Sequence, residues 1–163
     1  MFDDEITNYY NGMLARLEAL LYHEIALSAV KKIDFVGTDF LNSKEIRGNT
    51  ASEVIESCIQ EITSKGLVES INYSIHGYGI LLKLEAKDCI HIPKEIELKK
   101  EGIKPYMCPI ANMIGDRLIE ILGYETTYMA DMNIDENSKN CIVKYAIFED
   151  ISKIGQVSDW TKI

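Results

Sequence analysis

The fold of this chain is organised around residues 107–125, which read Met-Cys-Pro-Ile-Ala-Asn-Met-Ile-Gly-Asp-Arg-Leu-Ile-Glu-Ile-Leu-Gly-Tyr-Glu. Apolar residues recur there at the spacing of a helix, and the set is Ile110, Met113, Ile114, Leu118, Ile121 and Leu122. Pro109 suits the first helical turn, and Gly123 suits the left-handed residue that often ends a helix. The stretch therefore predicts an amphipathic helix with Cys108 as its N-cap.

Cys108 is the first candidate for chemistry. A thiol at a helix N-terminus feels the positive end of the helix dipole, which favours the thiolate. It could be a metal ligand or an ordinary buried cysteine, and the sequence leaves both open. Nucleophilic catalysis by Cys108 would also need a base, for which His91 is the best candidate among the three histidines. An enzyme that uses Cys108 as thiolate or metal ligand therefore stays an alternative.

Alternating apolar residues flank this helix on both sides and predict strands. Upstream, residues 67–86 read as two strands around the bend His76-Gly77-Tyr78-Gly79. Downstream, residues 124–134 and 141–148 alternate in the same way around a polar turn. Strands in adjacent pairs indicate an antiparallel sheet of two hairpins packed on helices, which is an α+β fold.

Two further helices are predicted before the first hairpin. Thr50 and Glu53 form a capping box ahead of a helix whose apolar stripe includes Cys58. Apolar residues cover more than half of a helix over residues 13–31, so we expect the domain or a second copy to bury it. The interleaved charges of residues 94–106 predict a solvated loop.

The chain is expected to contain one main domain with a short segment at either end. Residues 1–48 are predicted to be an N-terminal helical extension and a homodimer interface. Residues 49–150 form the α+β domain, and residues 151–163 form a C-terminal tail.

Composition bounds the class of protein. The chain has 163 residues, of which 47% are hydrophobic and 26% are charged, as in ordinary globular domains. The net charge of -9 argues against nucleic-acid binding. No apolar run is long enough to span a membrane, and the acidic start is unlike a signal peptide, so we expect a cytoplasmic protein without membrane insertion.

The candidate metal ligands are Cys89, His91, Cys108 and Cys141. Three thiolates and one imidazole suit a tetrahedral zinc ion. These three cysteines and Cys58 are the four of the chain and include no Cys-x-x-Cys pair, so their spacing alone favours buried free cysteines. An oxygen ligand could instead come from Asp131, Asp135 or Glu136.

Several of these features together resemble the 4-vinyl reductase family, also called the predicted hydrocarbon-binding domain. The residues that carry the likeness are His76 to Leu84, Asp88-Cys89, Cys108-Pro109-Ile110-Ala111, Gly115, Gly123 and Cys141 to Ile147. The resemblance covers residues 67–148. It implies a fold shared with transport-protein-particle subunits and haem nitric-oxide-binding domains, often dimeric, with an apolar pocket between sheet and helices.

The resemblance also implies a role for particular residues. Cys108 and Cys141 match the cysteine zinc site of the family's aromatic-sensing regulators, whereas Asn133 stands where those regulators carry another cysteine. Cys89 or His91 would have to replace it. Reductase activity is not implied, because the chain has no nucleotide-binding fingerprint.

The leading hypothesis is a dimeric module that binds or senses a small apolar, aromatic or hydrocarbon-like molecule. The expected ligand-binding residues are Tyr73, His76, Tyr78, Leu82, Met113 and Leu118. His76 and Tyr78 can equally be surface residues of the bend. An assembly subunit that uses its N-terminal helix as an interface is the other alternative.

Overall fold

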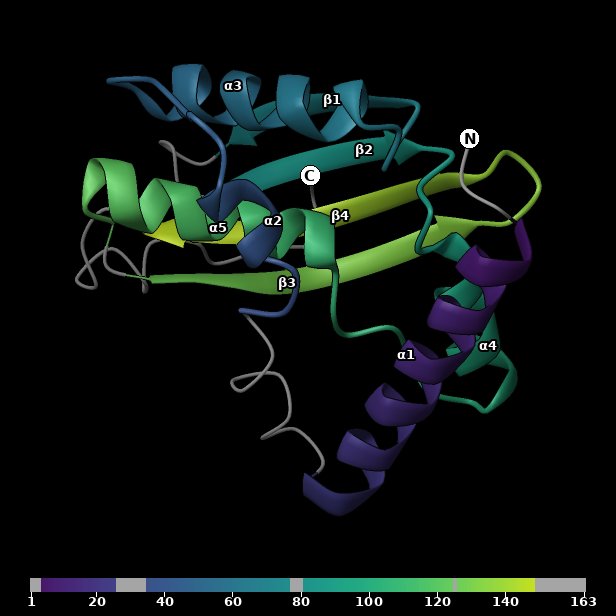
Figure 1. Cartoon of the computed structure of the whole chain (residues 1–163). Coiled ribbons are helices and arrows are strands. Elements are labelled where there is room, and N and C mark those ends of the chain that lie inside the picture. The colour runs from purple at the N-terminus through teal and green to yellow at the C-terminus, as the bar shows by residue number, and fades with distance from the viewer. Residues whose placement is uncertain (1–3, 26–34, 77–80, 125, 149–163) are drawn as a thin grey trace.

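The computed structural model describes residues 4–25, 35–76, 81–124 and 126–148, with the backbone alone at 126–130 and 148 (Figure 1). Its centre is one four-stranded antiparallel sheet with the strand order β1-β2-β4-β3. The strands are β1 (Ser70–His76), β2 (Leu81–Lys87), β3 (Thr126–Asp135) and β4 (Asn140–Phe148). The two predicted hairpins and the α+β fold are therefore confirmed.

The register between the two hairpins follows from side-chain alternation. In the central pairing of β2 with β4, Leu82 lies opposite Tyr145 and Leu84 lies opposite Val143. All four side chains are buried in the main core, whereas Lys83, between the two leucines, points to the other face. A slip by one residue would turn this apolar face toward solvent, so burial fixes the pairing.

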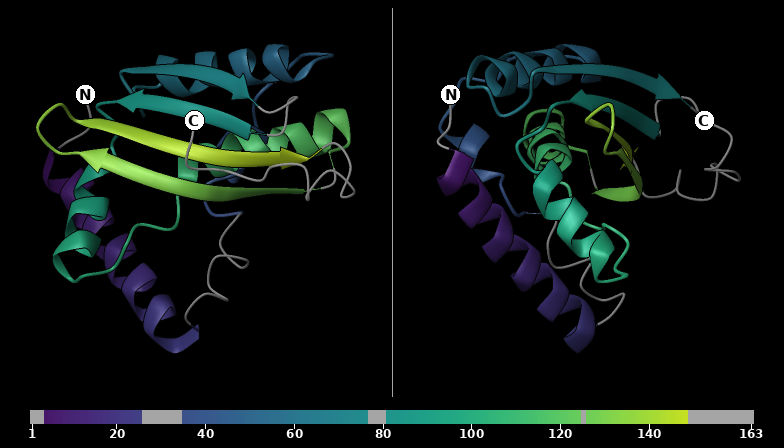
Figure 2. Two further views of the ribbon diagram at one scale, coloured as in Figure 1. Left: turned by 180° about the vertical axis from the view of Figure 1, so that it is seen from behind. Right: turned by 90° about the vertical axis from the view of Figure 1, so that its right-hand side faces the viewer.

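Helices α3 (Ala51–Ser64) and α5 (Pro109–Leu122) cover one face of the sheet, and α2 (Asp39–Asn42) packs on α5 (Figures 1 and 2). The predicted capping box is present at the start of α3. The hydroxyl oxygen of Thr50 accepts the Glu53 N–H at 3.3 Å, and the Glu53 carboxylate accepts the Thr50 N–H at 3.2 Å. Gly123 ends α5 with φ of 71°, the left-handed conformation expected of it.

Helices α1 (Asp4–Ile25) and α4 (Ile92–Lys100) lie side by side and extend away from the sheet, as both views in Figure 2 show. They have a small apolar core of their own. It consists of Ala15, Ala19, Leu98, Ile103, Tyr106 and Met107. Helix α1 begins earlier than the predicted helix over 13–31, and residues 26–34 lie outside the described part of the chain.

Helix α4 corrects the prediction of a charged loop over residues 94–106. Pro93 occupies its first turn, where proline is favoured, and Lys94 and Glu95 point inward. The prediction was wrong because it took charged residues to be solvated, whereas here they are buried as a paired cluster. Within the described ranges, no helix is long and apolar enough to cross a membrane.

Candidate functional site

Three of the cysteines occupy the ends of different elements. Cys89 follows β2, Cys108 is the N-cap of α5, and Cys141 lies at the start of β4. All three are free, buried and part of the main core. Cys89 and Cys141 both lie within electrostatic range of Cys108, whose charge raises the pKa of each of them.

The environment of Cys108 favours the thiol. Its Sγ accepts the Ala111 N–H at 3.5 Å, as expected of an N-cap, but its residue is only 8% exposed. Burial raises the pKa of Cys108 to about 11 and that of Cys89 to about 12, and it raises the pKa of Cys141 further. The N-cap prediction is therefore confirmed. At Cys108 desolvation outweighs the helix dipole, so burial favours the thiol over the free thiolate.

The native thiols are expected to react slowly with iodoacetamide. With the pKa of Cys58 also raised to about 12 by burial, all four thiols should be alkylated at least ~10-fold more slowly than glutathione at pH 8. In 6 M guanidinium chloride, all four should react at the rate of the model thiol. Mass spectrometry of the time course measures both rates. Native Cys108 that reacts as fast as glutathione would contradict the prediction and favour the enzyme alternative.

His91 is the N-cap of α4, and its backbone N–H donates a hydrogen bond to the Cys89 side chain. Burial, together with the charge of Lys94, lowers the pKa of His91 to about 4, so the imidazole is neutral near pH 7. Three thiols and a neutral imidazole fit the donor chemistry of zinc. Among the residues that the structure describes, however, no group of three or more His, Cys, Asp and Glu side chains is arranged to hold a metal ion. Zinc binding therefore stays a prediction, and elemental analysis of the purified protein would test it.

The alternative oxygen ligands have other partners. Asp131 accepts a hydrogen bond from Lys104 at 2.7 Å, and Glu136 accepts one from Lys99 at 3.2 Å. Asp135 accepts hydrogen bonds from the turn that follows it, from the N–H groups of Asn137 and Ser138. Asn133 is an exposed residue of β3.

A buried charged cluster joins α1 to α4 and was not predicted from the sequence. Lys94 is 0% exposed, and its Nζ lies 2.6 Å from Glu18 Oε1 and 3.1 Å from the Met107 carbonyl oxygen. The same ammonium forms an ion pair with the Glu95 carboxylate. Glu18 occurs between Ala15 and Ala19 on the apolar face of α1, which was the one sequence signal of this cluster.

The cluster contains two carboxylates and only one ammonium. Burial raises the pKa of Glu95 to about 7 and also raises the pKa of Glu18. Burial alone would lower the pKa of Lys94, but the two carboxylates beside it raise it. One oxygen of Glu18 and one of Glu95 have no hydrogen-bond partner among the described residues. The carboxylates therefore carry an excess of negative charge that protonation relieves.

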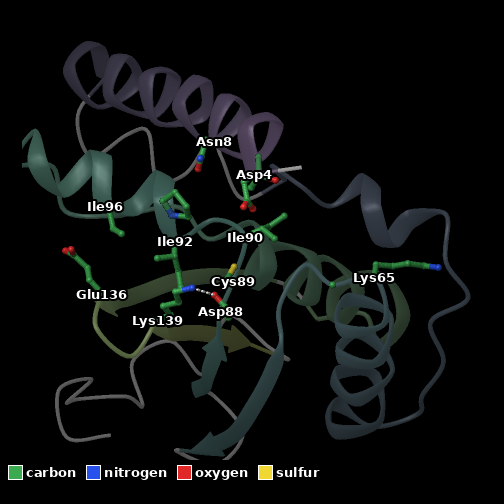
Figure 3. Close-up of a pocket in the computed structure, with 13 residues that line it drawn as sticks. Asp4, Asn8, Lys65, Asp88, Cys89, Ile90, Ile92, Ile96, Glu136 and Lys139 are labelled. Atoms are coloured by element: carbon green, nitrogen blue, oxygen red, sulfur yellow. Dashed lines mark ion pairs between the residues drawn. The ribbon is translucent and has the colours of Figure 1, made fainter. Parts of the chain in front are cut away.

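Figure 3 shows a cavity of about 580 Å³ next to Cys89. Its floor is apolar and consists of Cys89, Ile90, Ile92, Pro93 and Ile96. Its rim is polar and consists of Asp4, Thr7, Asn8, Lys65, Gly66, Asp88, Glu136 and Lys139. The rim residues come from α1, from the end of α3, from the residue after β2 and from the turn between β3 and β4. The cavity therefore forms only when these distant segments meet.

Two rim residues have an unusual backbone conformation. Asp88 has φ of 52° and Lys139 has φ of 53°, in the left-handed region that non-glycine residues rarely adopt. The Asp88 N–H donates to the Lys139 carbonyl oxygen at 2.8 Å, and the Lys139 Nζ lies 3.3 Å from Asp88 Oδ1. These contacts, one of them drawn in Figure 3, fix both residues at the rim.

The structure does not gather the expected ligand-binding residues around this cavity. Leu82, Met113 and Leu118 are packed in the main core. The Tyr73 hydroxyl donates to Glu56 Oε1 at 2.8 Å, and His76 Nε2 lies 2.7 Å from the Ser74 hydroxyl. Tyr78 lies outside the described residues.

A second hollow, of about 630 Å³, lies closer to those residues. It is lined by Asn49, Thr50, Ala51, Ser52, Ile75, Leu122, Gly123 and Tyr124. Ile75 lies between Ser74 and His76 on β1, so this hollow opens where β1, α3 and α5 end or begin. It is more polar in character than the floor in Figure 3, because it includes the N-terminal turn of α3.

Compared with models of protein families and with curated proteins, the sequence matches none of them.

Proposed function

We propose that the protein is a module that binds a small apolar or aromatic molecule in the cavity of Figure 3. The observation that carries the proposal is the combination of an apolar floor with a fixed polar rim. Small-molecule sites typically have volumes of ~300–1,000 Å³, mostly apolar walls and a few placed polar groups. The cavity of about 580 Å³ falls within this range of volumes, and its apolar floor and polar rim offer a ligand both kinds of contact.

The floor provides the affinity in this proposal. Cys89 and Ile92 belong to the main core, and Ile90 and Ile96 pack against it as partly buried residues. These residues form the edge of the main core, and this apolar edge is open to solvent at the cavity. A ligand that covers this margin removes apolar surface from water, which stabilises binding by roughly 25 cal/mol per Å².

The rim provides the orientation of the ligand. Asp88 and Lys139 present a carboxylate and an ammonium beside the floor. Left-handed backbone at non-glycine residues costs about 1–3 kcal/mol each, and beside its use in turns it clusters at ligand and active sites. Two such residues on one rim support binding of a molecule with a polar group at one end.

The experiment is a titration with Nile red, a neutral apolar dye. Wild type is expected to bind about one dye per chain, saturably, and Ile96→Lys should weaken binding at least ~10-fold because it places a charge on the floor. Ile119→Lys is the matched control, because Ile119 is an exposed residue of α5 away from the cavity. Native mass spectrometry of freshly purified protein would detect a molecule that co-purifies.

A second variant protects the test against misfolding of Ile96→Lys. Lys139→Gly removes the rim ammonium, and glycine adopts the left-handed conformation without strain, so this variant should fold as well as wild type. Circular dichroism checks the fold of each variant. The proposal fails if both variants are folded and bind the dye as wild type does, or if wild type binds no dye saturably.

A further inference from the structure

Helix α1 has an exposed apolar face in addition to the face that packs on α4. We call it the α1 stripe, and its residues are Ile6, Tyr9, Tyr10, Met13, Leu17 and Leu20. Their exposed fractions range from 42% to 63%. The residues recur every three or four positions, so they form one continuous line along the helix.

Among the described residues, the stripe lies away from the contact that α1 makes with α4. Ala15 and Glu18 are buried on the side of α1 that meets α4. Met13 and Leu17 are each two residues from Ala15, and Leu20 is two residues from Glu18, which places them roughly 200° around the helix. Figure 2 shows that α1 meets α4 on one side only and that its other side faces away from the sheet.

The stripe is large for a monomer. With roughly 200 Å² of accessible surface for each large side chain, the exposed fractions amount to roughly 600–700 Å². A typical monomer has no larger apolar patch than ~300–600 Å², and one side of a standard protein interface buries ~800 Å². The α1 stripe therefore has nearly the area that one partner contributes to a stable dimer.

We propose that the α1 stripe pairs antiparallel with the α1 stripe of a second copy, with Met13 at the two-fold axis. Four of its residues are symmetric about Met13: Ile6 and Leu20 each lie seven positions away, and Tyr9 and Leu17 each lie four. The position that corresponds to Tyr10 is Arg16, which lies outside the stripe. Under a two-fold axis a patch must complement itself, so Ile6 meets Leu20 of the other copy and Tyr9 meets Leu17. Antiparallel packing also places each positive helix end beside a negative one.

Charge argues for a second copy over a membrane surface. Over its described length, α1 carries four acidic residues and a single arginine, Arg16. A helix that lies on an anionic membrane instead carries several Lys and Arg residues beside its apolar face. The occupant that fits an acidic helix with two symmetric pairs of apolar residues is the same stripe of a second copy.

Cysteine cross-linking tests the register. The four native thiols are buried, so an introduced cysteine reacts selectively with bis-maleimidoethane. Met13→Cys should cross-link to its own copy, and Leu20→Cys should not. A mixture of Leu20→Cys with Ile6→Cys should cross-link again. Ser64→Cys, at an exposed residue of α3, is the control for random collision. Cross-linking of Leu20→Cys alone as efficiently as Met13→Cys would overturn the antiparallel pairing.

Analytical ultracentrifugation tests the association itself. Wild type should be a dimer at micromolar concentration, and Leu17→Asp should raise the dimer dissociation constant by roughly 100-fold, because it sets a charge against the partner's apolar stripe. Ile119→Asp, on an exposed residue of α5, should leave the dimer intact. A monomeric wild type, a Leu17→Asp variant that still dimerises, or wild-type monomers that sediment with phosphatidylserine vesicles would each overturn the proposal.

Discussion

Replacing Lys94 with methionine is expected to lower the free energy of unfolding by about 3–5 kcal/mol. The ammonium is fully buried and is the common partner of Glu18, Glu95 and the Met107 carbonyl. Methionine fills similar volume but leaves two carboxylates side by side in a dry environment. Either they take up protons or α1 separates from α4, and both outcomes destabilise the fold. Urea denaturation followed by circular dichroism measures the change.

Two further variants identify the cause of that loss. Lys100→Met is the matched control, because Lys100 lies on the same helix with its side chain 65% exposed, and it should change stability by less than about 1 kcal/mol. The triple variant Glu18→Leu, Lys94→Met, Glu95→Leu removes every charge and should recover most of the stability lost in Lys94→Met. If Lys94→Met were as stable as Lys100→Met, the cluster would not hold α1 to α4.

Glu95→Gln is expected to gain stability relative to wild type as the pH rises from 5 to 8, by up to about 3 kcal/mol. Burial raises the pKa of Glu95 to about 7 in the folded protein, whereas an unfolded glutamate titrates near 4.5. Between these values the unfolded chain releases the proton and the folded chain keeps it. Wild type therefore loses stability over this pH range, and above pH 7 the loss is complete. Glutamine has no proton to lose.

Comparison with wild type is essential because His91 titrates with the opposite sign. Its pKa is lowered to about 4, so folding excludes a proton that the unfolded chain binds, and stability falls as the pH drops from 6.5 toward 4. This effect is common to both proteins and cancels in the difference. Urea midpoints at pH 5, 6, 7 and 8 measure it, with the exposed Glu97→Gln as control. A difference that does not change with pH would contradict the assignment.

The elements that were predicted correctly have signals within a few neighbouring residues. The capping box at Thr50 and the apolar spacing of α5 are local patterns, and they mark these helices in the sequence before any distant contact is considered. Helix α4 has no such pattern, because two of its buried residues are charged. Lys94 becomes a core residue only through Glu18, which lies far away in the chain.

The site was less predictable for a related reason. Positions at element ends suggested that Cys89, Cys108 and Cys141 meet. The structure buries all three in the main core, but it does not arrange them among the described residues as a group that could hold a metal ion. The protonation state of these thiols depends on how deeply the fold buries them, and the spacing of cysteines in the sequence does not predict that burial. The rim of the cavity depends on the backbone angles of Asp88 and Lys139, and neither residue type demands a left-handed conformation.

The pairing of β2 with β4 at the centre of the sheet has a consequence for synthesis of the chain. Each hairpin is local, but Leu82 meets Tyr145 only after most of the chain has left the ribosome. Until then, the inner edge of β2 presents unsatisfied backbone groups and an apolar face, which is the kind of surface that associates with other chains. Because β4 comes last in the chain, we expect the nascent chain to depend most on chaperones while the first hairpin waits for β4.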